Sequence, residues 1–301
     1  MDRLKAMSIV VQVVDSGSFS GASRALGIPL ATISRQVTEL EAHLGTKLLT
    51  RTTRKLALTD AGTAYLAAAR RILDDVDETE RAAAGEYHSP RGELILTAPV
   101  AFGRLLVLPV IRDFLVAYPK IDVRLVLSDR NLHLMDEHID LAVRIGPLPD
   151  SSMVATRVGS IRTVVVASPG LLAAHGKPQS PEDLPGMPGV HFDILSPAGR
   201  WTFTGPGGQT HDSAPRPRLT VSSADAAVWS ACDGVGVTRV LSYQCADAVK
   251  SGSLHVLLEE FEPAPLPVHL VHAGRGVLPA KLRSFLDFAK SRLRSSLTAL
   301  W

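Results

Sequence analysis

The sequence predicts an N-terminal all-α winged helix-turn-helix, a long linker helix and a C-terminal α/β domain. Up to Gly45, apolar residues recur every three or four positions, as on amphipathic helices, and glycine-containing turns interrupt them twice. An alanine-rich, acidic stretch follows, and short apolar runs then alternate with helical stretches to the end of the chain. We therefore expect three regions, residues 1–59, 60–89 and 90–301.

The first two helices of the head are short. Apolar residues at three- and four-residue intervals from Leu4 to Val14 predict the first, which ends at Ser16-Gly17. Ser18 is a good N-cap for a second helix from about Phe19 to Leu26, and Gly27 is suited to the left-handed residue that ends it.

A third helix is expected over residues 31–44, because Pro29 disfavours helical geometry at the residue before it. One face of this helix carries an apolar stripe: Ile33, Val37, Leu40 and Leu44. The opposite face carries polar residues: Thr32, Arg35, Gln36, Glu39 and His43. Two helices joined by a short turn that contains glycine are typical of a helix-turn-helix.

A hairpin and a long helix come next. Strands at 47–49 and 56–58 flank a polar bend, and Thr59 and Asp60 are suitable caps for a helix over about 61–87. Residues at alternating three- and four-residue spacing predict a coiled-coil seam on this helix, which Ile72 widens: Leu66, Ala69, Leu73, Val76, Glu80 and Ala83. The helix is therefore expected to be a dimerising linker.

The rest of the chain reads as alternating strands and helices, which favours an α/β domain with mainly parallel sheets. The expected strands are 93–97, 121–127, 139–145, 163–167, 218–222, 235–238 and 266–272. The expected helices are 109–117, 169–175, 224–232, 241–250 and 279–293. Proline- and glycine-rich stretches at 178–188 and 205–217 are expected to be surface loops.

Charge is unevenly distributed, although the whole chain has a formal net charge of only +2. Residues 1–58 hold eight Lys or Arg against four Asp or Glu, whereas residues 59–88 are acidic. This asymmetry points to an anionic partner for the head. The two cysteines fit a reducing compartment, and neither a signal peptide nor a membrane span is recognisable, so we expect a cytoplasmic protein.

Short sequence words follow one another without a gap through the head. They are Asp15–Phe19, Ala22–Leu26, Ile33–Gln36, Leu40–Glu41, Leu44–Gly45, Leu48–Arg54 and Leu58–Gly62. In these words the head closely resembles LysR-type transcriptional regulators. Five later stretches are more loosely similar to the effector domain of that family: 96–99, 114–119, 140–146, 234–236 and 281–288.

The resemblance implies an effector-binding domain like the type II periplasmic binding proteins, with a small molecule in the cleft between two subdomains. The first subdomain would comprise about 90–161 and 267–301, and the second about 162–266. The resemblance also implies homodimers through the linker helix, homotetramers, and double-stranded promoter DNA as partner, with RNA polymerase as a further candidate. It implies no cofactor and no membrane.

Candidate DNA-binding residues lie on the third helix and the hairpin. Arg35 suits two hydrogen bonds to guanine and Gln36 two to adenine, whereas the hairpin cations suit the DNA backbone or a narrow minor groove. The full set is Ser18, Arg24, Ala31, Thr32, Ser34, Arg35, Gln36, Arg51, Thr53, Arg54 and Lys55. Alternatively, Arg35 is a solvated surface arginine and Arg51 pairs with Glu41 or Asp60. The segment Pro29–Thr32 departs from the family pattern, so operator preference cannot be transferred.

Candidate effector-binding residues follow predicted strands. Thr97 and the free amides beyond it could receive an anion such as a carboxylate, and Ser222 precedes a helix in the second subdomain. The full set is Thr97, Pro99, Val100, Phe102, Ser128, Arg144, Ile145, Phe192, Trp201 and Ser222. A small organic acid or aromatic metabolite would suit it. Ordinary helix capping by Thr97 and Ser222, and a structural salt bridge of Arg144, remain alternatives.

Other classes of protein fit less well. We find no Gly-x-Ser-x-Gly, Walker or His-Glu-x-x-His motif, and Gly234-Val235-Gly236 lacks the third glycine of a dinucleotide site. His133 and His138 have no nearby cysteine and favour solvated histidines over a metal site. Cys232 and Cys245 could form a redox switch, but buried inert thiols are favoured. A periplasmic solute binder would need the signal peptide that we do not find.

Overall fold

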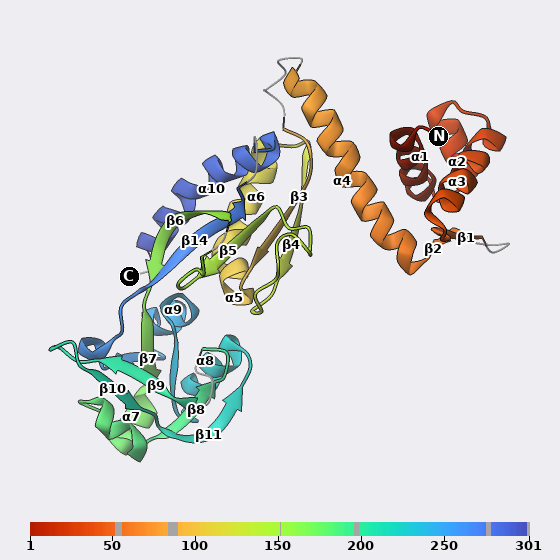
Figure 1. Ribbon diagram of the computed structural model, residues 1–301. Coiled ribbons are helices and arrows are strands. Elements are labelled where there is room, and N and C mark those ends of the chain that lie inside the picture. Colours follow the sequence, from red (N-terminus) through yellow and green to blue (C-terminus); the bar gives the residue numbers. More distant parts are fainter. Residues whose placement is uncertain (52–55, 84–89, 151, 196–198, 275–277, 300–301) are drawn as a thin grey trace. The chain divides into compact units, whose positions relative to one another are not determined.

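The chain forms two compact units, Met1–Ser89 and Pro90–Trp301, in a computed structural model (Figure 1). The structure describes residues 1–51, 56–83, 90–150, 152–195, 199–274 and 278–299. Each unit is described by itself below.

Three helices build the core of the first unit: α1 (Arg3–Asp15), α2 (Phe19–Leu26) and α3 (Leu30–Leu44). Ser18 Oγ accepts a hydrogen bond from the Gly21 amide at 3.0 Å and caps α2, and Gly27 ends that helix with a φ of 65°. Most of the apolar stripe of α3 is buried against α1, but Leu44, the last residue of the helix, is 39% exposed.

The predicted hairpin pairs β1 (Leu49–Arg51) with β2 (Leu56–Leu58) in antiparallel register. The first strand starts two residues later than expected. The amides of Leu48 and Leu49 both bond to the Glu41 side chain, and pairing with β2 begins at Leu49, opposite Leu58. The bend of the hairpin, residues 52–55, lies outside the described residues.

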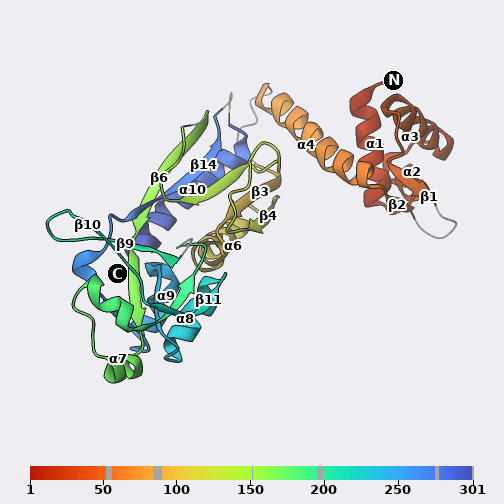
Figure 2. The same cartoon turned by 60° about the horizontal axis from the view of Figure 1, so that its bottom comes forward.

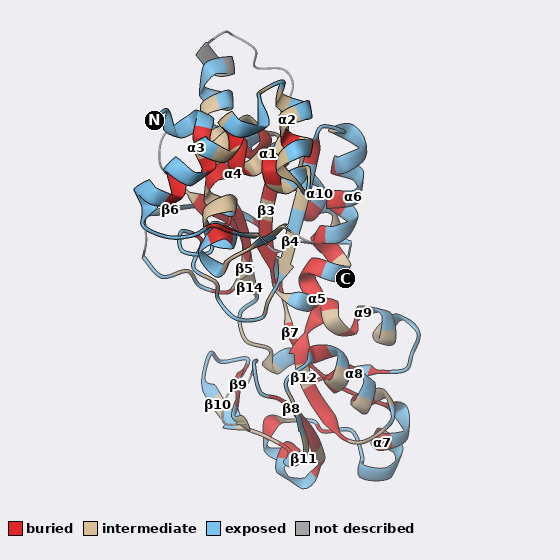
Figure 3. Cartoon of the chain, turned by 90° about the vertical axis from the view of Figure 1, so that its right-hand side faces the viewer, coloured by how far each residue is buried: buried red, intermediate tan, exposed pale blue. Residues whose placement is uncertain are grey.

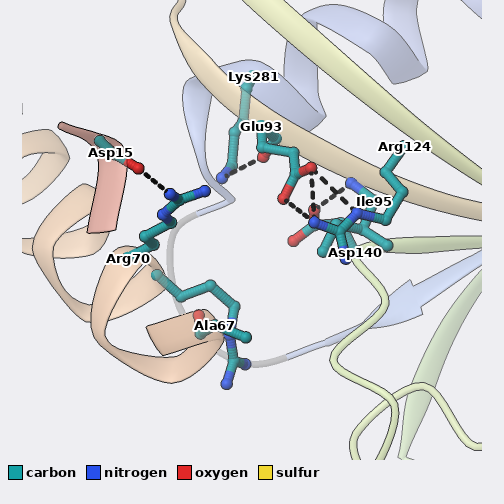
Figure 4. A network of polar contacts seen from close by, with 9 residues as sticks. Asp15, Ala67, Arg70, Glu93, Ile95, Arg124, Asp140 and Lys281 are labelled. Carbon is teal, nitrogen blue, oxygen red and sulfur yellow. Dashed lines mark hydrogen bonds and ion pairs between the residues drawn. The ribbon is translucent and has the colours of Figure 1, made fainter. Parts of the chain in front are cut away.

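Helix α4 (Asp60–Ala83) follows directly, and its predicted continuation to residue 87 lies outside the described residues. Thr59 Oγ1 caps it by accepting a hydrogen bond from the Gly62 amide at 2.9 Å. The helix packs along α1, where Ala69 is buried and Arg70 pairs with Asp15 (Figure 4).

The residues of the predicted coiled-coil seam on α4 differ in how far they are buried. Leu66, Leu73 and Val76 are half-buried, Glu80 is exposed, and Ile72 is 41% exposed. The side chain of Ala83 lies outside the described set. Ile72, Leu73 and Val76 therefore form an apolar edge on α4 that is partly open to solvent.

The second unit contains two five-stranded sheets. The first has the strand order β4-β3-β5-β14-β6, and its strands are β3 (Gly92–Ala98), β4 (Ile121–Leu127), β5 (Leu141–Ile145), β6 (Met153–Ile161) and β14 (Leu266–Ala273). Its core includes residues of α6 (Leu108–Ala117) and α10 (Ala280–Thr298). A short helix α5 (Val100–Phe102) and a π-helix η1 (Gly103–Val107) precede α6, so the helical stretch starts nine residues before the expected 109.

The second sheet has the order β11-β8-β12-β7-β13. Its strands are β7 (Thr163–Ala167), β8 (Pro188–Phe192), β11 (Arg216–Val221), β12 (Val237–Leu241) and β13 (His255–Leu257). A separate hairpin joins β9 (Trp201–Thr204) to β10 (Thr210–Ser213). The helices of this half are α7 (Pro169–His175), η2 (Pro181–Gly186), α8 (Ala224–Cys232), α9 (Ser242–Lys250) and η4 (Glu259–Phe261) (Figure 2).

The two halves are joined by two crossings of the chain. One lies between β6 and β7, at Arg162, and the other leads from η4 into β14. The largest cluster of buried residues lies in the first half and also takes in Leu241 and Tyr243 of the second, whose other clusters are its own (Figure 3).

The expectation of mainly parallel sheets is wrong. In each sheet three neighbouring strands are parallel, but β14 runs antiparallel to β5 and β6, and β7 runs antiparallel to β12 and β13. The expected surface loops are also more ordered than predicted. Residues 178–188 include η2 and the start of β8, and residues 205–217 include β10 and the start of β11.

Gly62 provides a test of how α4 is seated on the hairpin. An alanine inside a helix normally stabilises it by about 1 kcal/mol relative to glycine. A Cβ at Gly62, however, would lie 1.9 Å from the backbone oxygen of Leu48. We expect Gly62→Ala to destabilise the first unit by about 1–3 kcal/mol, seen as a lower urea midpoint by circular dichroism.

Gly170→Ala is the matched control, because a Cβ there would meet no atom within 4 Å. It is expected to leave the midpoint unchanged or slightly raised. Equal behaviour of the two variants would show that α4 does not press on Leu48.

Candidate DNA-binding surface and effector cleft

The exposed face of α3 combines small and polar side chains. A surface hollow of about 550 Å³ is lined by Ala31, Ser34, Arg35, Thr38, Glu39 and Ala42. Arg35 is 70% exposed, and its Nε lies 3.6 Å from Glu39 Oε1, one turn further along the helix. Such an exposed pair contributes little to stability, so the guanidinium can be given up to another acceptor. The small neighbours would let that acceptor approach closely.

The other predicted contacts on α2 and α3 differ in accessibility. Arg24 is exposed, whereas Thr32 and Ser34 are half-buried. The Oγ of Ser18 already caps α2. Gln36 Oε1 is buried without a hydrogen-bond partner among the described residues. Because a two-bond contact to adenine uses both the oxygen and the nitrogen of the amide, Gln36 would have to rotate first.

The predicted wing contacts fall mostly outside what the structure describes. Arg51 ends β1, but its side chain is not described, and Thr53, Arg54 and Lys55 lie in the undescribed bend. Their role in binding DNA, and the alternative pairing of Arg51, stay predictions.

A buried carboxylate fixes the hairpin to the exposed helix. Glu41, on α3, is 7% exposed; its Oε1 accepts hydrogen bonds from the amides of Leu48 at 3.0 Å and Leu49 at 3.1 Å, and Lys47 Nζ donates to its Oε2 at 2.7 Å. Burial alone would raise the pKa of Glu41, but Lys47 and the two amides outweigh it and lower that pKa below its ordinary value. The carboxylate therefore stays charged at neutral pH.

The place predicted for an anionic effector is occupied by a carboxylate of the chain itself. Thr97 is 1% exposed and its Oγ1 donates to the Val126 carbonyl at 2.9 Å, so its hydroxyl is committed between β3 and β4. Pro99 precedes α5, and the Val100 amide donates to Asp129 Oδ1 at 3.0 Å. The amide thus has the position and polarity to hold a carboxylate.

Two contacts join the halves of the second unit beside this place. Phe102 is fully buried and meets Tyr243 of α9 edge-on, with ring centroids 5.3 Å apart. Arg104 of η1 pairs with Asp225 of α8 at 2.8 Å, and both side chains are about half exposed. Burial raises the pKa of Tyr243, so its hydroxyl stays protonated. The rings and the ion pair together hold α5 and η1 against α8 and α9.

The remaining candidates of the first subdomain are partly accessible. Ser128 Oγ accepts a hydrogen bond from the Arg130 amide at 3.1 Å, and Ile145 is half-buried at the end of β5. Arg144 donates to Asn131 Oδ1 at 2.9 Å and to the Leu132 carbonyl. Burial lowers the pKa of Arg144. Since its partners among the described residues are uncharged oxygens, the salt-bridge alternative finds no support there.

The candidates of the second subdomain do not converge. Phe192, at the end of β8, is buried with residues of α8, and Ser222 is exposed beside Ser223, which caps α8. Trp201 has no exposed surface and packs with Leu184 in a different core cluster. We therefore correct its assignment to the cleft, because its core cluster, among the described residues, contains none of the first subdomain.

Both cysteines are free, Cys245 buried and Cys232 half-buried. Burial raises the pKa of both thiols, that of Cys245 to about 12, so neither is a thiolate at neutral pH. Within the described part of the chain, no group of three His, Cys, Asp or Glu side chains is placed to hold a metal ion.

Comparison with known proteins identifies this architecture. Residues 4–63 match the family described as bacterial regulatory helix-turn-helix protein, lysR family, and residues 88–294 match the LysR substrate binding domain. The chain belongs to the LysR family. It is therefore a DNA-binding transcription regulator with an effector-binding domain, and not an enzyme.

Individual LysR-type relatives extend over almost the whole chain. An HTH-type transcriptional repressor of Pseudomonas aeruginosa is 36% identical over 300 residues, which is 96% of this chain and 91% of the relative. The solved structure of CrgA from Neisseria meningitidis is 32% identical with a TM-score of 0.62, covering 96% of this chain and 98% of CrgA. The full-length virulence activator AphB of Vibrio cholerae is 27% identical with a TM-score of 0.61, covering 95% of this chain and 98% of AphB.

These matches confirm the predicted fold, a winged helix-turn-helix and linker followed by a two-subdomain effector domain. Within the described residues, none of the helices is both long and apolar enough to cross a membrane.

Sequence reasoning missed four residues of the LysR-type effector domain: Asp129, Arg104, Asp225 and Tyr243. A signal existed for Asp129, because it follows the predicted strand 121–127 as Pro99 follows 93–97, and parallel neighbours end at the same edge. Arg104 and Asp225 are separated by 121 residues, and their pairing depends on how the halves of the second unit fold together.

The charge state of Glu41 gives a pH-dependent prediction. Because its pKa is lower in the folded chain, its stabilisation is fully present above the ordinary value of 4.5 and is lost as pH falls through the lower, folded value. Glu41→Gln should destabilise the first unit by about 1–3 kcal/mol at pH 7, measured by urea unfolding.

The difference between wild type and Glu41→Gln should shrink as the pH is lowered below 4.5. Glu39→Gln is the control, since this carboxylate on the same helix is half exposed. A difference between wild type and Glu41→Gln that stays constant down to pH 3 would contradict the assignment.

Proposed function

We propose that this regulator inserts α3 into the major groove of promoter DNA, with Arg35 in contact with a base pair. The supporting observation is the exposed face of α3, where a 70% exposed arginine stands among small side chains. A guanidinium in this setting can form two parallel hydrogen bonds to guanine, and Ser34 can reach a phosphate. The cations of the hairpin, Arg51, Arg54 and Lys55, would contact the backbone beside it.

We further propose that the chain dimerises through α4 and assembles into tetramers in the cytoplasm. The support is the apolar edge of α4, on which Ile72 is 41% exposed and Leu73 and Val76 are half-buried. A second copy of α4 would cover this edge at coiled-coil spacing. Dimerisation would place two copies of α3 on the two halves of a symmetric operator.

For the effector, we propose a small carboxylic acid, including aromatic ones, in the cleft between the subdomains. The Val100 amide already donates a hydrogen bond to a carboxylate, that of Asp129. Arg144, in the same subdomain, is a cation whose hydrogen-bond acceptors are neutral oxygens. A ligand carboxylate that displaces Asp129 would also disturb the neighbouring contacts between Arg104 and Asp225 and between Phe102 and Tyr243. In this way ligand binding would change how the two subdomains meet.

Arg35→Ala tests the proposed DNA contact. It should weaken binding to the chain's own upstream DNA by about 1–3 kcal/mol, which is roughly 5- to 150-fold, and relax preference at one base pair. Fluorescence anisotropy and footprinting at fixed salt measure the two effects.

Arg112→Ala is the control, because it removes an equally exposed arginine from α6 in the second unit. It should leave DNA affinity unchanged. If Arg35→Ala behaves in the same way as this control, α3 does not read DNA through Arg35.

Ile72→Glu tests the proposed dimer. A charge on the apolar edge of α4 should raise the dimer dissociation constant at least 10-fold, because a buried unpaired carboxylate costs several times RT. Sedimentation velocity over a concentration series measures the shift. Ala67→Glu, at an exposed position five residues earlier, should have little effect, and identical mass distributions for both variants would contradict dimerisation through this edge.

A further inference from the structure

Arg239 is a half-buried arginine of the second subdomain that has no counter-ion among the described residues. It lies on β12, opposite Val165 of β7, and its guanidinium carbon stands 5.6 Å from the centre of the Phe203 ring. Among the residues that the structure describes, it makes neither a hydrogen bond nor an ion pair. Burial lowers the pKa of Arg239 to about 10, and no neighbouring group offsets that effect. An arginine at this depth is normally paired, because an unpaired buried charge is costly.

The other inward-facing arginines of this unit do have partners. Arg162, at the first crossing of the chain, bonds twice to Glu262, both times at 2.7 Å, and once to Glu259 at 3.0 Å. Arg144 donates to two oxygens. Arg239 therefore differs from both in what surrounds it, and not merely in being buried.

A second unpaired donor belongs to the same core cluster. Trp201 is fully buried, and its Nε1 has no acceptor among the described residues. Trp201 and Phe203 alternate along β9, so both rings face the same side, and both are buried while Thr202 between them is exposed. Arg239 contacts the ring of Phe203. The ring of Trp201 belongs to the same buried cluster as Val165 and Val237, which lie on the same face of the sheet as Arg239.

The neighbouring strand completes the arrangement. His191 on β8 follows Val190, which pairs with Thr238, so His191 lies next to Arg239 in the sheet. Its ring lies 5.8 Å from that of Trp201, and its Nε2 donates to the Pro215 carbonyl at 3.2 Å. Two strand residues, His191 and Arg239, thus face two residues of β9, Trp201 and Phe203.

We propose that Arg239 and the Nε1 of Trp201 bind a small oxyanion, a carboxylate or a phosphate, beneath β9. This site is separate from the cleft between the subdomains. A planar guanidinium binds such an anion with two parallel N–H donors, and the indole N–H supplies a third. Because Arg239 is only half-buried, an anion can reach it from solvent, and the fully buried Trp201 would contact that anion from the interior. The bound anion would neutralise the buried cation and fasten β9 to the second sheet.

Thermal unfolding of the full-length chain tests the site, with sodium acetate, sodium benzoate and sodium phosphate as probes at constant ionic strength set with sodium chloride. We expect at least one probe to raise Tm saturably by about 3–5 °C at ten times its Kd. The three arms distinguish a carboxylate from a phosphate. Absence of a saturable rise with every probe overturns the proposal.

Arg239→Met is the decisive variant. It should abolish the rise in Tm and, without an anion, unfold at the same temperature as the wild type or higher, because it removes an unpaired buried charge. Arg144→Met, in the proposed effector cleft, should keep the rise. If the rise persists in Arg239→Met and disappears in Arg144→Met, the anion binds in the cleft and the inference is wrong.

Trp201→Phe keeps an aromatic ring and removes only the indole donor, so it stays informative if Arg239→Met does not fold. The loss of one hydrogen bond should weaken apparent anion affinity by about 2- to 10-fold. In a Trp229→Phe, Trp301→Phe chain, Trp201 emission should also change on anion addition. Unchanged affinity in Trp201→Phe, or unchanged emission in the double variant, contradicts contact between the anion and the indole.

Discussion

The pairing of β6 with β14 is the constraint from which the effector domain takes its form. These strands run antiparallel from Leu266 opposite Ile161 to Ala273 opposite Met153, although more than a hundred residues separate them in sequence. The segment between Arg162 and Leu266 must therefore fold as an insertion between two neighbouring strands of the first sheet. The second sheet is built wholly within this insertion, so the two subdomains share two strand connections. A ligand-dependent change between them has to pass through these connections or through side-chain contacts such as Arg104 with Asp225.

The DNA-binding unit depends on a different kind of constraint, a buried charge rather than a backbone ladder. Among the described residues, the buried carboxylate of Glu41 accepts its hydrogen bonds from the segment immediately after α3. A chain with apolar side chains in place of Glu41 and Lys47 could be as stable, but those side chains would not fix where the hairpin starts. The carboxylate specifies that Leu48 enters the core and that strand pairing begins at Leu49. Position, more than stability, is what this ion pair contributes.

Local signals allowed some elements to be predicted to the residue. Helices α7 and α8 match their expected bounds because Ser168 and Ser223 cap them and the apolar spacing is regular. Strand β6 escaped prediction because its exposure does not alternate, and β8 because it begins at Pro188 after a proline-rich stretch. The local sequence pattern does not encode strand direction, so the antiparallel strand pairs in both sheets were not predicted. Similarly, the helix caps at Ser18 and Thr59 were predictable, whereas the carboxylate of Asp129 at Val100 depends on the register between β3 and β4.

The seating of Gly62 against Leu48 has a consequence for how such regulators can be recombined. Because no side chain fits between α4 and the hairpin, the start of α4 and the head form one rigid part. A chimaera that joined the head of one relative to the linker of another at Thr59 would cut through this contact and through the cap that Thr59 provides. A junction placed after α4 would leave the head, the hairpin and α4 intact. The head and the linker helix are thus best exchanged as one part, and the sensing half as another.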